Sequence, residues 1–260
     1  LEATRALVAR VEADRPARVV VDSLSELRLL AGSPLRYRRQ MLAYKQFFAQ
    51  RKATVLLLDD RTAEEHDRHV QSIVSGVLHL EQTYPDYGGQ RRRLRIVKYR
   101  AAEYRSGYHD FVIRGGGIRV FPRLVSSEHR RAFEPERVAS GIAELDPVLG
   151  GGVERGTSTL LVGSAGTGKS TLAAQCLAAA AARGEAGAAF LFDESKEMLL
   201  RRCALLGVDI GQHVESGRIV LHPVDPAELS PGELVDRVRY EVEQRDARAI
   251  LIDSLNGYTN

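Results

Sequence analysis

Residues 163–170 have the types and the spacing needed to bind a phosphate chain. They fit the pattern G-x-x-x-x-G-K-[S/T] at every fixed position and read Gly163, Ser164, Ala165, Gly166, Thr167, Gly168, Lys169 and Ser170. Glycines let backbone amides turn toward a polyphosphate, Lys169 can reach its β and γ phosphates, and the Ser170 hydroxyl can hold Mg²⁺. The pattern predicts a nucleotide site, with Thr171 as its last residue. The plain alternative is a glycine-rich turn that precedes a helix.

This chemistry requires the loop to lie between a strand and a helix. Residues 158–162 (STLLV) form a short apolar run that predicts a buried strand, and residues 171–178 are rich in helix formers. The start of such a helix adds partial positive charge to the backbone amides of the loop. The flanking segments therefore agree with the motif.

Apolar runs elsewhere predict an α/β fold with a mostly parallel sheet. Strands are expected at 18–24, 53–59 and 249–255, and helices at 1–14, 34–51 and 234–243. Leu35, Met41, Leu42, Phe47 and Phe48 mark the apolar side of the second helix. Beyond residue 72 the pattern changes to short strands at 73–80, 93–99, 111–113 and 117–121, joined by Gly-rich turns. These predict antiparallel hairpins at an edge of the sheet.

The chain contains an internal repeat with the period of a whole domain. Residues 18–24 (RVVVDSL) and 249–255 (AILIDSL) match at an offset of 231 positions (253 − 22), and a helix precedes each run. The same offset pairs Glu2 with Glu233, Val11 with Val242, Glu12 with Glu243 and Leu24 with Leu255. We expect the later half of one α/β domain followed by the earlier half of a second, so the chain reads as a piece of a longer protein. Chance similarity between short apolar runs is the alternative.

Composition narrows the class of protein. The chain has 260 residues, of which 44% are hydrophobic and 27% charged, as in ordinary globular proteins. A net charge of +3 and arginine clusters at 36–39 and 91–95 leave a nucleic-acid face open without implying one. The sequence contains no run of about 18 apolar residues that would predict a membrane span, and no charged-then-apolar leader suggests export. The cytoplasm is therefore the expected compartment. Cys176 and Cys203 lie in apolar helical patterns and are predicted to be reduced core thiols.

The segment before the loop gives the most specific resemblance. Residues 140–152 follow S-G-x-x-x-L-D-x-x-L-G-G-G, and with the strand and loop that come next they resemble the RecA-type ATPases, especially the KaiC family. Lys98-Tyr99-Arg100 is similar to the K-x-R element of that family, and residues 111–122 to its terminal strands. The resemblance implies a RecA-like P-loop fold with two tandem domains. It places a first-domain half at 1–123, a linker at 124–136 and a second-domain half at 137–260.

The resemblance also implies roles for charged residues. Glu194 would be the general base, and Asp193 stands where relatives usually have Glu. Asp253 would be the Walker B acid that holds Mg²⁺, and Asp22 its counterpart in the first domain. Lys98 and Arg100 lie two apart on a strand, so they share a face and would reach the γ-phosphate bound to a neighbouring subunit. The alternatives are strand-end acids that bind only water and a basic, solvated sheet edge.

The function implied by the resemblance is Mg²⁺-dependent ATP hydrolysis in a homo-oligomeric, hexameric ring with a signalling or clock-like role and signalling proteins as partners. Three alternatives stay open. The first is a kinase that phosphorylates its own Ser and Thr residues. The second is a scaffold that binds ATP in order to assemble, which the shorter Asp193 favours. The third is a DNA recombinase or helicase relative, against which residues 23–33 argue because they are too short and apolar for a DNA-binding loop.

Overall fold

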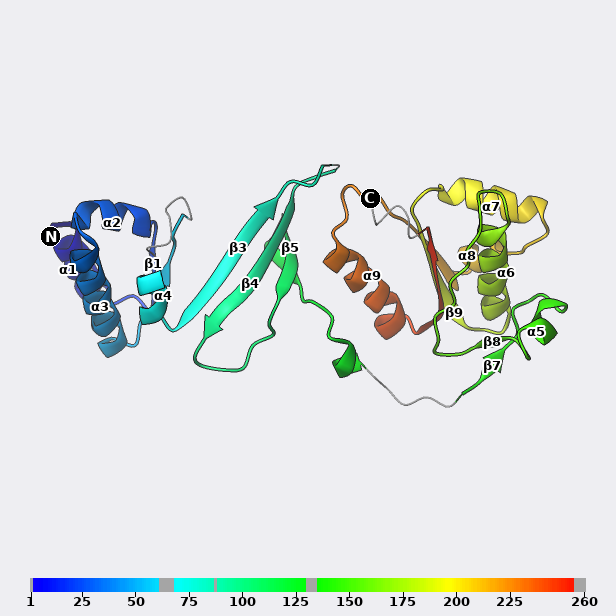
Figure 1. The fold of residues 1–260 in the computed structure, drawn as a ribbon, viewed down its shortest axis with the longest axis horizontal. Coiled ribbons are helices and arrows are strands. Elements are labelled where there is room, and N and C mark those ends of the chain that lie inside the picture. Colours follow the sequence, from blue (N-terminus) through cyan, green and yellow to red (C-terminus); the bar gives the residue numbers. More distant parts are fainter. Residues whose placement is uncertain (1, 61–67, 87, 130–134, 255–260) are drawn as a thin grey trace. The chain divides into compact units, whose positions relative to one another are not determined.

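The computed structural model of the chain describes residues 2–60, 68–86, 88–129 and 135–254 (Figure 1). By their internal contacts, residues 1–79 with 95–106 form one compact unit, and residues 80–94 with 107–260 form another. This division groups residues that pack together in space. The domain boundaries expected from the motifs instead separate the two copies of the repeated domain along the sequence. Those boundaries therefore stay a prediction.

The first unit is a small parallel sheet covered by helices. Strands β1 (Arg18–Val21) and β2 (Thr54–Leu57) pair in parallel, with Val19 opposite Val55. A shared apolar core joins them to four helices. These are α1 (Glu2–Asp14), α2 (Leu24–Ala31), α3 (Pro34–Gln50) and α4 (Arg68–Ile73).

The buried face of α3 differs from the expected one. Its buried residues are Tyr37, Met41, Tyr44 and Phe48, which recur at the spacing of one helical face. Leu35 and Leu42 are exposed. Two tyrosines thus take the core positions that the sequence pattern had assigned to leucines, because helical spacing from Met41 and Phe48 selects them.

The predicted antiparallel strands form, but as a four-stranded sheet of their own and not at the edge of either described parallel sheet. The sheet order is β3-β4-β5-β6, and β5 pairs antiparallel with β6. The predicted strand at 73–80 begins only at Gly76, because α4 continues through Ile73. The strand bounds are β3 (Gly76–Thr83), β4 (Arg91–Tyr99), β5 (Tyr108–Arg114) and β6 (Gly117–Phe121).

The predicted linker contains one short 3₁₀ helix, η2 (Ser126–His129), and its residues 130–134 lie outside the described residues. A two-stranded ladder then opens the segment that leads to the loop. It pairs β7 (Arg137–Val138) with β8 (Val153–Glu154), and the short helix α5 (Leu145–Val148) lies between them.

The second unit also holds a three-stranded parallel sheet with helices on both faces (Figure 1). Its strand order is β10-β9-β11. One core lies between the sheet and α6, α7 and α8, and another joins the opposite face to α9. The elements are α6 (Lys169–Ala182), β9 (Ala186–Leu191), α7 (Lys196–Leu205), α8 (Gly211–Glu215), β10 (Ile219–Pro223), α9 (Pro231–Gln244) and β11 (Ala247–Asp253).

The backbone supports the internal repeat. The helix α1 and strand β1 correspond to α9 and β11, and the turn between helix and strand contains a left-handed residue in both copies. These residues are Arg15 with φ 45° and Asp246 with φ 54°, which are 231 positions apart (246 − 15). Lys52, in the turn between α3 and β2, is also left-handed with φ 52°, so this conformation is common to the helix-to-strand turns of the described chain and does not by itself identify the repeat. Leu255, the predicted partner of Leu24, lies outside the described residues.

The strand predicted at 158–162 does not form. These residues join no ladder with any described strand, and Leu160 and Val162 are 72% and 85% exposed. An apolar run indicates a strand only where neighbouring strands can cover it. Among the described residues, β11 pairs only with β9, so residues 158–162 have no ladder beside β11. In the first copy, β1 has β2 as its neighbour. The prediction of a buried strand is therefore wrong for this structure.

Within the described part of the chain, no helix combines the length and the apolar character that a membrane crossing requires.

Candidate nucleotide-binding site

The loop at 163–170 has the backbone conformation that its glycines permit. Gly166 and Gly168 have φ angles of 79° and 89°, in the left-handed region that strains other residues. A Cβ atom at Gly163 would lie 2.6 Å from Oγ1 of Thr167, so the loop has no room for a side chain there. Thr167 donates a hydrogen bond through this oxygen to the Ser164 carbonyl at 2.9 Å. The loop thus curls over its own first residues.

The cation of the motif lies inside this curl. Lys169 donates through Nζ to the carbonyl oxygens of Gly163 at 2.9 Å and Ser164 at 2.8 Å. Lys169 and Ser170 are the first residues of α6, and Gly168 is its N-cap. The Lys169 ammonium group therefore lies beside the backbone amides at the start of α6. Such an arrangement binds anions.

A turn ahead of the loop packs against the last turn of α6. The buried Ser140 donates its backbone N–H to Oδ1 of Asp146 at 2.8 Å, and the Asp146 carbonyl accepts from the amides of Gly151 and Gly152. Hydrogen bonds from Ser140 lower the pKa of Asp146. A Cβ atom at Gly141 would lie 2.8 Å from Cβ of Ala179 in α6. Ser140 and Asp146 belong to the segment at 140–152 that carries the family resemblance, but their sequence positions alone do not indicate these contacts.

The loop and the strand-end acids of the second copy lie at the same edge of the sheet. Helix α6 packs against β9 and β11, and only residues 183–185 separate its end from the start of β9. Its 14 residues span about 21 Å and the six residues of β9 about 20 Å. The helix therefore runs back along the strand, and its first turn lies level with the carboxyl end of β9. Lys169 and Ser170 are thus at the edge where Asp193 follows β9 and Asp253 ends β11.

Two of these acids are connected through the neighbouring strand. Ser254 donates through Oγ to Oδ2 of Asp193 at 2.7 Å, and the amide of Phe192 donates to the Asp253 carbonyl at 2.7 Å. The strands β9 and β11 are parallel, with Leu191 opposite Asp253. The structure therefore brings Asp193 and Asp253 together, although it shows no ligand between them.

Glu194 has a partner that the sequence did not indicate. Oε1 of Glu194 lies 2.9 Å from Nη1 of Arg202 in α7, and the Glu194 side chain is 17% exposed. The Nε and Nη2 atoms of Arg202 are buried and have no hydrogen-bond partner among the described residues. Arg202 therefore contacts Glu194 through Nη1 alone. Its proximity in space, and not its sequence position, marks it as part of the site.

Lys98 and Arg100 lie in the first unit and share a face, as the strand alternation predicts. Lys98 donates through Nζ to the carbonyls of Gln71 at 2.7 Å and Ser72 at 3.2 Å, and Arg100 donates through Nη2 to Ser72 at 3.2 Å. Partial loss of solvent, then the charges of Arg100 and Lys45, lower the pKa of Lys98. Both cations thus bind the last carbonyls of α4 in this structure. Asp22 is exposed at the end of β1 in the same unit.

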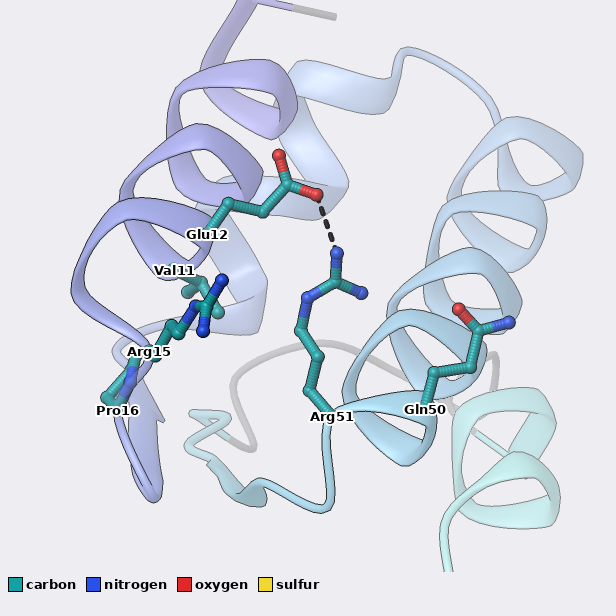
Figure 2. A pocket seen from close by; sticks show the side chains of 6 residues that line it. All are labelled: Val11, Glu12, Arg15, Pro16, Gln50 and Arg51. Atoms are coloured by element: carbon teal, nitrogen blue, oxygen red, sulfur yellow. Dashed lines mark hydrogen bonds and ion pairs between the residues drawn. The ribbon is translucent and has the colours of Figure 1, made fainter.

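A hollow in the first unit has a different lining. It measures about 510 Å³ and lies between α1 and the end of α3 (Figure 2). Arg51 spans it to Glu12 at 2.6 Å and lies over the Phe47 ring, with its guanidinium carbon 3.7 Å from the ring centroid. None of the predicted site residues lines it. Its lining residues are Val11, Glu12, Arg15, Pro16, Gln50 and Arg51.

A glycine-rich loop that closes on a lysine at a helix start, beside strand-end acids of a parallel sheet, defines a P-loop domain of RecA type. Comparison with known families agrees: the family described as "ATPase: KaiC" matches residues 2–125 and 138–260. This chain belongs to the KaiC ATPase family.

The curated relatives carry the same family name. A circadian clock oscillator protein KaiC from a Picosynechococcus strain is 30% identical over 178 residues, covering 66% of this chain and 34% of the relative. KaiC of Synechococcus elongatus is 26% identical over 245 residues, covering 93% and 47% respectively. The circadian clock protein KaiC2 of a Synechocystis strain is 36% identical over 126 residues, covering 48% and 22%. The chain thus spans less than half the length of each of these relatives.

Proposed function

We propose that the chain binds ATP with Mg²⁺ in the loop at 163–170 and contributes to ATP hydrolysis by a KaiC-type ring. The observation that carries this proposal is the position of Lys169 and Ser170 at the start of α6, level with the carboxyl ends of β9 and β11. Membership of an ATPase family supports it.

The donor set fits a nucleotide and its metal. A Cβ built at Gly166 or Gly168 meets nothing within 4 Å, so open space lies in front of the loop backbone. Lys169 would bind the β and γ phosphates once its own carbonyl contacts give way to them. Mg²⁺ usually takes one or two carboxylates besides phosphates and water. Asp253 would supply the carboxylate, and the Ser170 hydroxyl would supply a further oxygen. When bound, the ion supplies neutralisation of the charge on the phosphate oxygens.

Glu194 is the proposed general base. A base must accept a proton from the attacking water, and a carboxylate at the strand edge beside the loop suits this role. Its pairing with Arg202 at 2.9 Å keeps the carboxylate at a fixed position beside α7. Asp193 is held by Ser254 and would act as an auxiliary acid.

Lys98, Arg100 and Asp22 would serve the first copy of the domain. In a ring, Lys98 and Arg100 of one subunit would exchange the α4 carbonyls for the γ-phosphate held by a neighbour, and Asp22 would hold the metal of its own copy. Their convergence on the Ser72 carbonyl supports a common direction for the two side chains. The homo-oligomer, with six subunits by family resemblance, belongs to this proposal, as do signalling partners and a cytoplasmic location.

A scaffold that binds ATP but hydrolyses little of it is the second candidate. Both carboxylates proposed for catalysis have protein partners, Arg202 for Glu194 and Ser254 for Asp193. Such contacts favour assembly over turnover if they persist when nucleotide binds.

The first experiment measures ATP affinity by titration calorimetry with and without Mg²⁺. Lys169→Ala should weaken binding at least tenfold, about 1.4 kcal/mol, while Lys45→Ala, at an exposed position of α3, should leave it unchanged. Equal affinities for the wild type and Lys169→Ala would remove the loop from the proposal.

Labelled ATP then separates the reactions. Glu194→Gln should retain ATP binding and lower phosphate release at least tenfold. Label found on the protein would indicate self-phosphorylation instead, because a Ser or Thr hydroxyl would then have replaced water as the acceptor. Binding without release or transfer in the wild type would favour the scaffold.

A further inference from the structure

The start of α9 is completed by a side chain from the β5–β6 hairpin. The first amides of a helix lack partners within the helix. In α9 the first residue, Pro231, has no N–H, and the Glu233 amide is capped by Oγ of Ser230 at 3.2 Å. The amide between them, of Gly232, donates to Oδ2 of Asp110 in β5 at 2.7 Å. A carboxylate at this end also interacts favourably with the helix dipole.

Charged pairs extend the same contact along α9. Glu233 is only 4% exposed, and its two carboxylate oxygens accept from Nη2 of Arg114 at 2.9 and 3.1 Å. Arg237 adds a third bond at 3.0 Å. One turn away, Arg119 of β6 pairs with Asp236 at 2.7 Å. A buried carboxylate is costly without partners. Arg114 of the hairpin and Arg237 of α9 together satisfy Glu233 in this contact.

The contact is also close in shape. A Cβ atom at Gly232 would lie 2.9 Å from Cβ and Oδ2 of Asp110 and 3.1 Å from Cβ of Phe121. Phe121 is itself only 2% exposed. Position 232 therefore tolerates no side chain while the hairpin is docked, although its backbone conformation does not require glycine.

The turn between β3 and β4 contacts the loop that precedes α9. Gly89 donates its N–H to the Ala227 carbonyl at 3.0 Å, and Arg91 donates through Nη2 to the Pro226 carbonyl at 3.0 Å. A Cβ atom at Gly88 would lie 2.4 Å from the Ala227 oxygen. Two neighbouring hairpins thus meet one continuous segment, residues 226–237.

We infer that residues 226–237 form a docking surface whose occupant is the hairpin pair β3–β4 and β5–β6 of the same chain. The hairpins belong to the part of the chain matched at 2–125 and α9 to the part matched at 138–260. Within the second compact unit, residues 80–94 and 107–121 of the first family match are therefore held against α9 of the second match by a polar interface. The inference does not depend on nucleotide binding or hydrolysis.

Gly232→Ala gives a test in which two explanations predict opposite signs. Alanine favours a helix over glycine, so an undocked α9 would become more stable. With the hairpin docked, the new methyl group collides with Asp110 and Phe121, and the midpoint of thermal unfolding should fall by about 2 °C or more. Gly211→Ala at the start of α8, where a Cβ meets nothing within 4 Å, is the control and should not lower the midpoint. A raised or unchanged midpoint for Gly232→Ala would overturn the inference.

Hydrogen exchange of the full chain provides a local readout. Asp110→Ala should speed exchange of the Gly232 amide at least tenfold. In the Gly232→Ala background, the same substitution should change the exchange rate of the amide at position 232 very little, because both substitutions remove the same contact. Unchanged exchange in Asp110→Ala would contradict docking. Protection of this amide that disappears on dilution would assign the occupant to a second copy and overturn the same-chain assignment.

Discussion

Ser254 donates a hydrogen bond to Asp193 at 2.7 Å, across the carboxyl ends of two neighbouring parallel strands. Ser254 directly follows Asp253, the acid proposed to hold the metal, and Asp193 directly precedes Glu194, the proposed base. One side-chain bond thus connects the two acidic segments of the candidate site. A substitution in either segment should therefore alter the stabilising contribution of the other.

The strength of this connection can be measured with a double-mutant cycle. Hydrogen bonds to charged groups contribute roughly 1.5–3 kcal/mol, and the exposure of Asp193 places the expected value at or below about 1 kcal/mol. In urea unfolding, Ser254→Ala and Asp193→Ala should therefore be less than additive by that amount. Strictly additive losses would show that the two residues act independently.

The core beneath α7 should be sensitive to cavity formation. Leu199 is 0% exposed and lies in the core shared with β9 and β10. Leu199→Ala should lower the free energy of unfolding by about 2–5 kcal/mol, because the lost contacts leave a cavity. Met198→Ala, at the exposed neighbouring position, should change it by less than about 0.5 kcal/mol. Similar losses for both variants would argue against this packing.

The turn ahead of the loop should weaken in acid. The pKa of Asp146 is lower in the folded chain than its ordinary 3.8, because Ser140 donates hydrogen bonds to the carboxylate. The unfolded chain therefore takes up the proton first as the pH falls. The stability that this contact contributes is present above about pH 4 and is lost as the pH falls through the folded pKa.

Asp146→Asn tests this linkage, since the amide keeps the shape but cannot titrate in this range. In urea unfolding, the variant should lose less stability than the wild type between about pH 5 and about pH 2, the range in which carboxylates titrate. A pH profile identical to that of the wild type would remove Asp146 from this role.

The left-handed turn after α1 should favour glycine. Arg15 has φ 45°, a conformation that costs an L-residue about 1 kcal/mol and glycine much less. Arg15→Gly should raise the free energy of unfolding by about 0.5–1 kcal/mol. Ala9→Gly, at an exposed position inside the same helix, should lower it by about 1 kcal/mol. A loss of stability from both changes would contradict the assigned turn.

Local pattern was enough to predict the loop, the α/β class, the antiparallel strands and the second copy of the helix and strand. These features depend on residues close in the sequence, such as Gly166, Gly168 and Lys169 in the loop. The run at 158–162 was mispredicted because the burial of a strand depends on neighbours that its own residues do not specify.

Contacts between distant residues could not be predicted from the sequence. Arg202 pairs with Glu194 across a helical turn, Lys98 binds the end of α4, and Asp110 caps a helix that starts 121 positions later (231 − 110). Each of these side chains is a common charged type, so its role is determined by its position in space.

Three helix-to-strand turns contain a left-handed residue that is not glycine: Arg15 with φ 45°, Lys52 with φ 52° and Asp246 with φ 54°. These side chains differ in size, and Asp246 differs from the other two in the sign of its charge. The residue type at the turn therefore does not determine this backbone conformation. The helix that ends before the turn and the strand that begins after it determine the conformation instead, so a change of side chain at these positions should leave the path of the main chain intact.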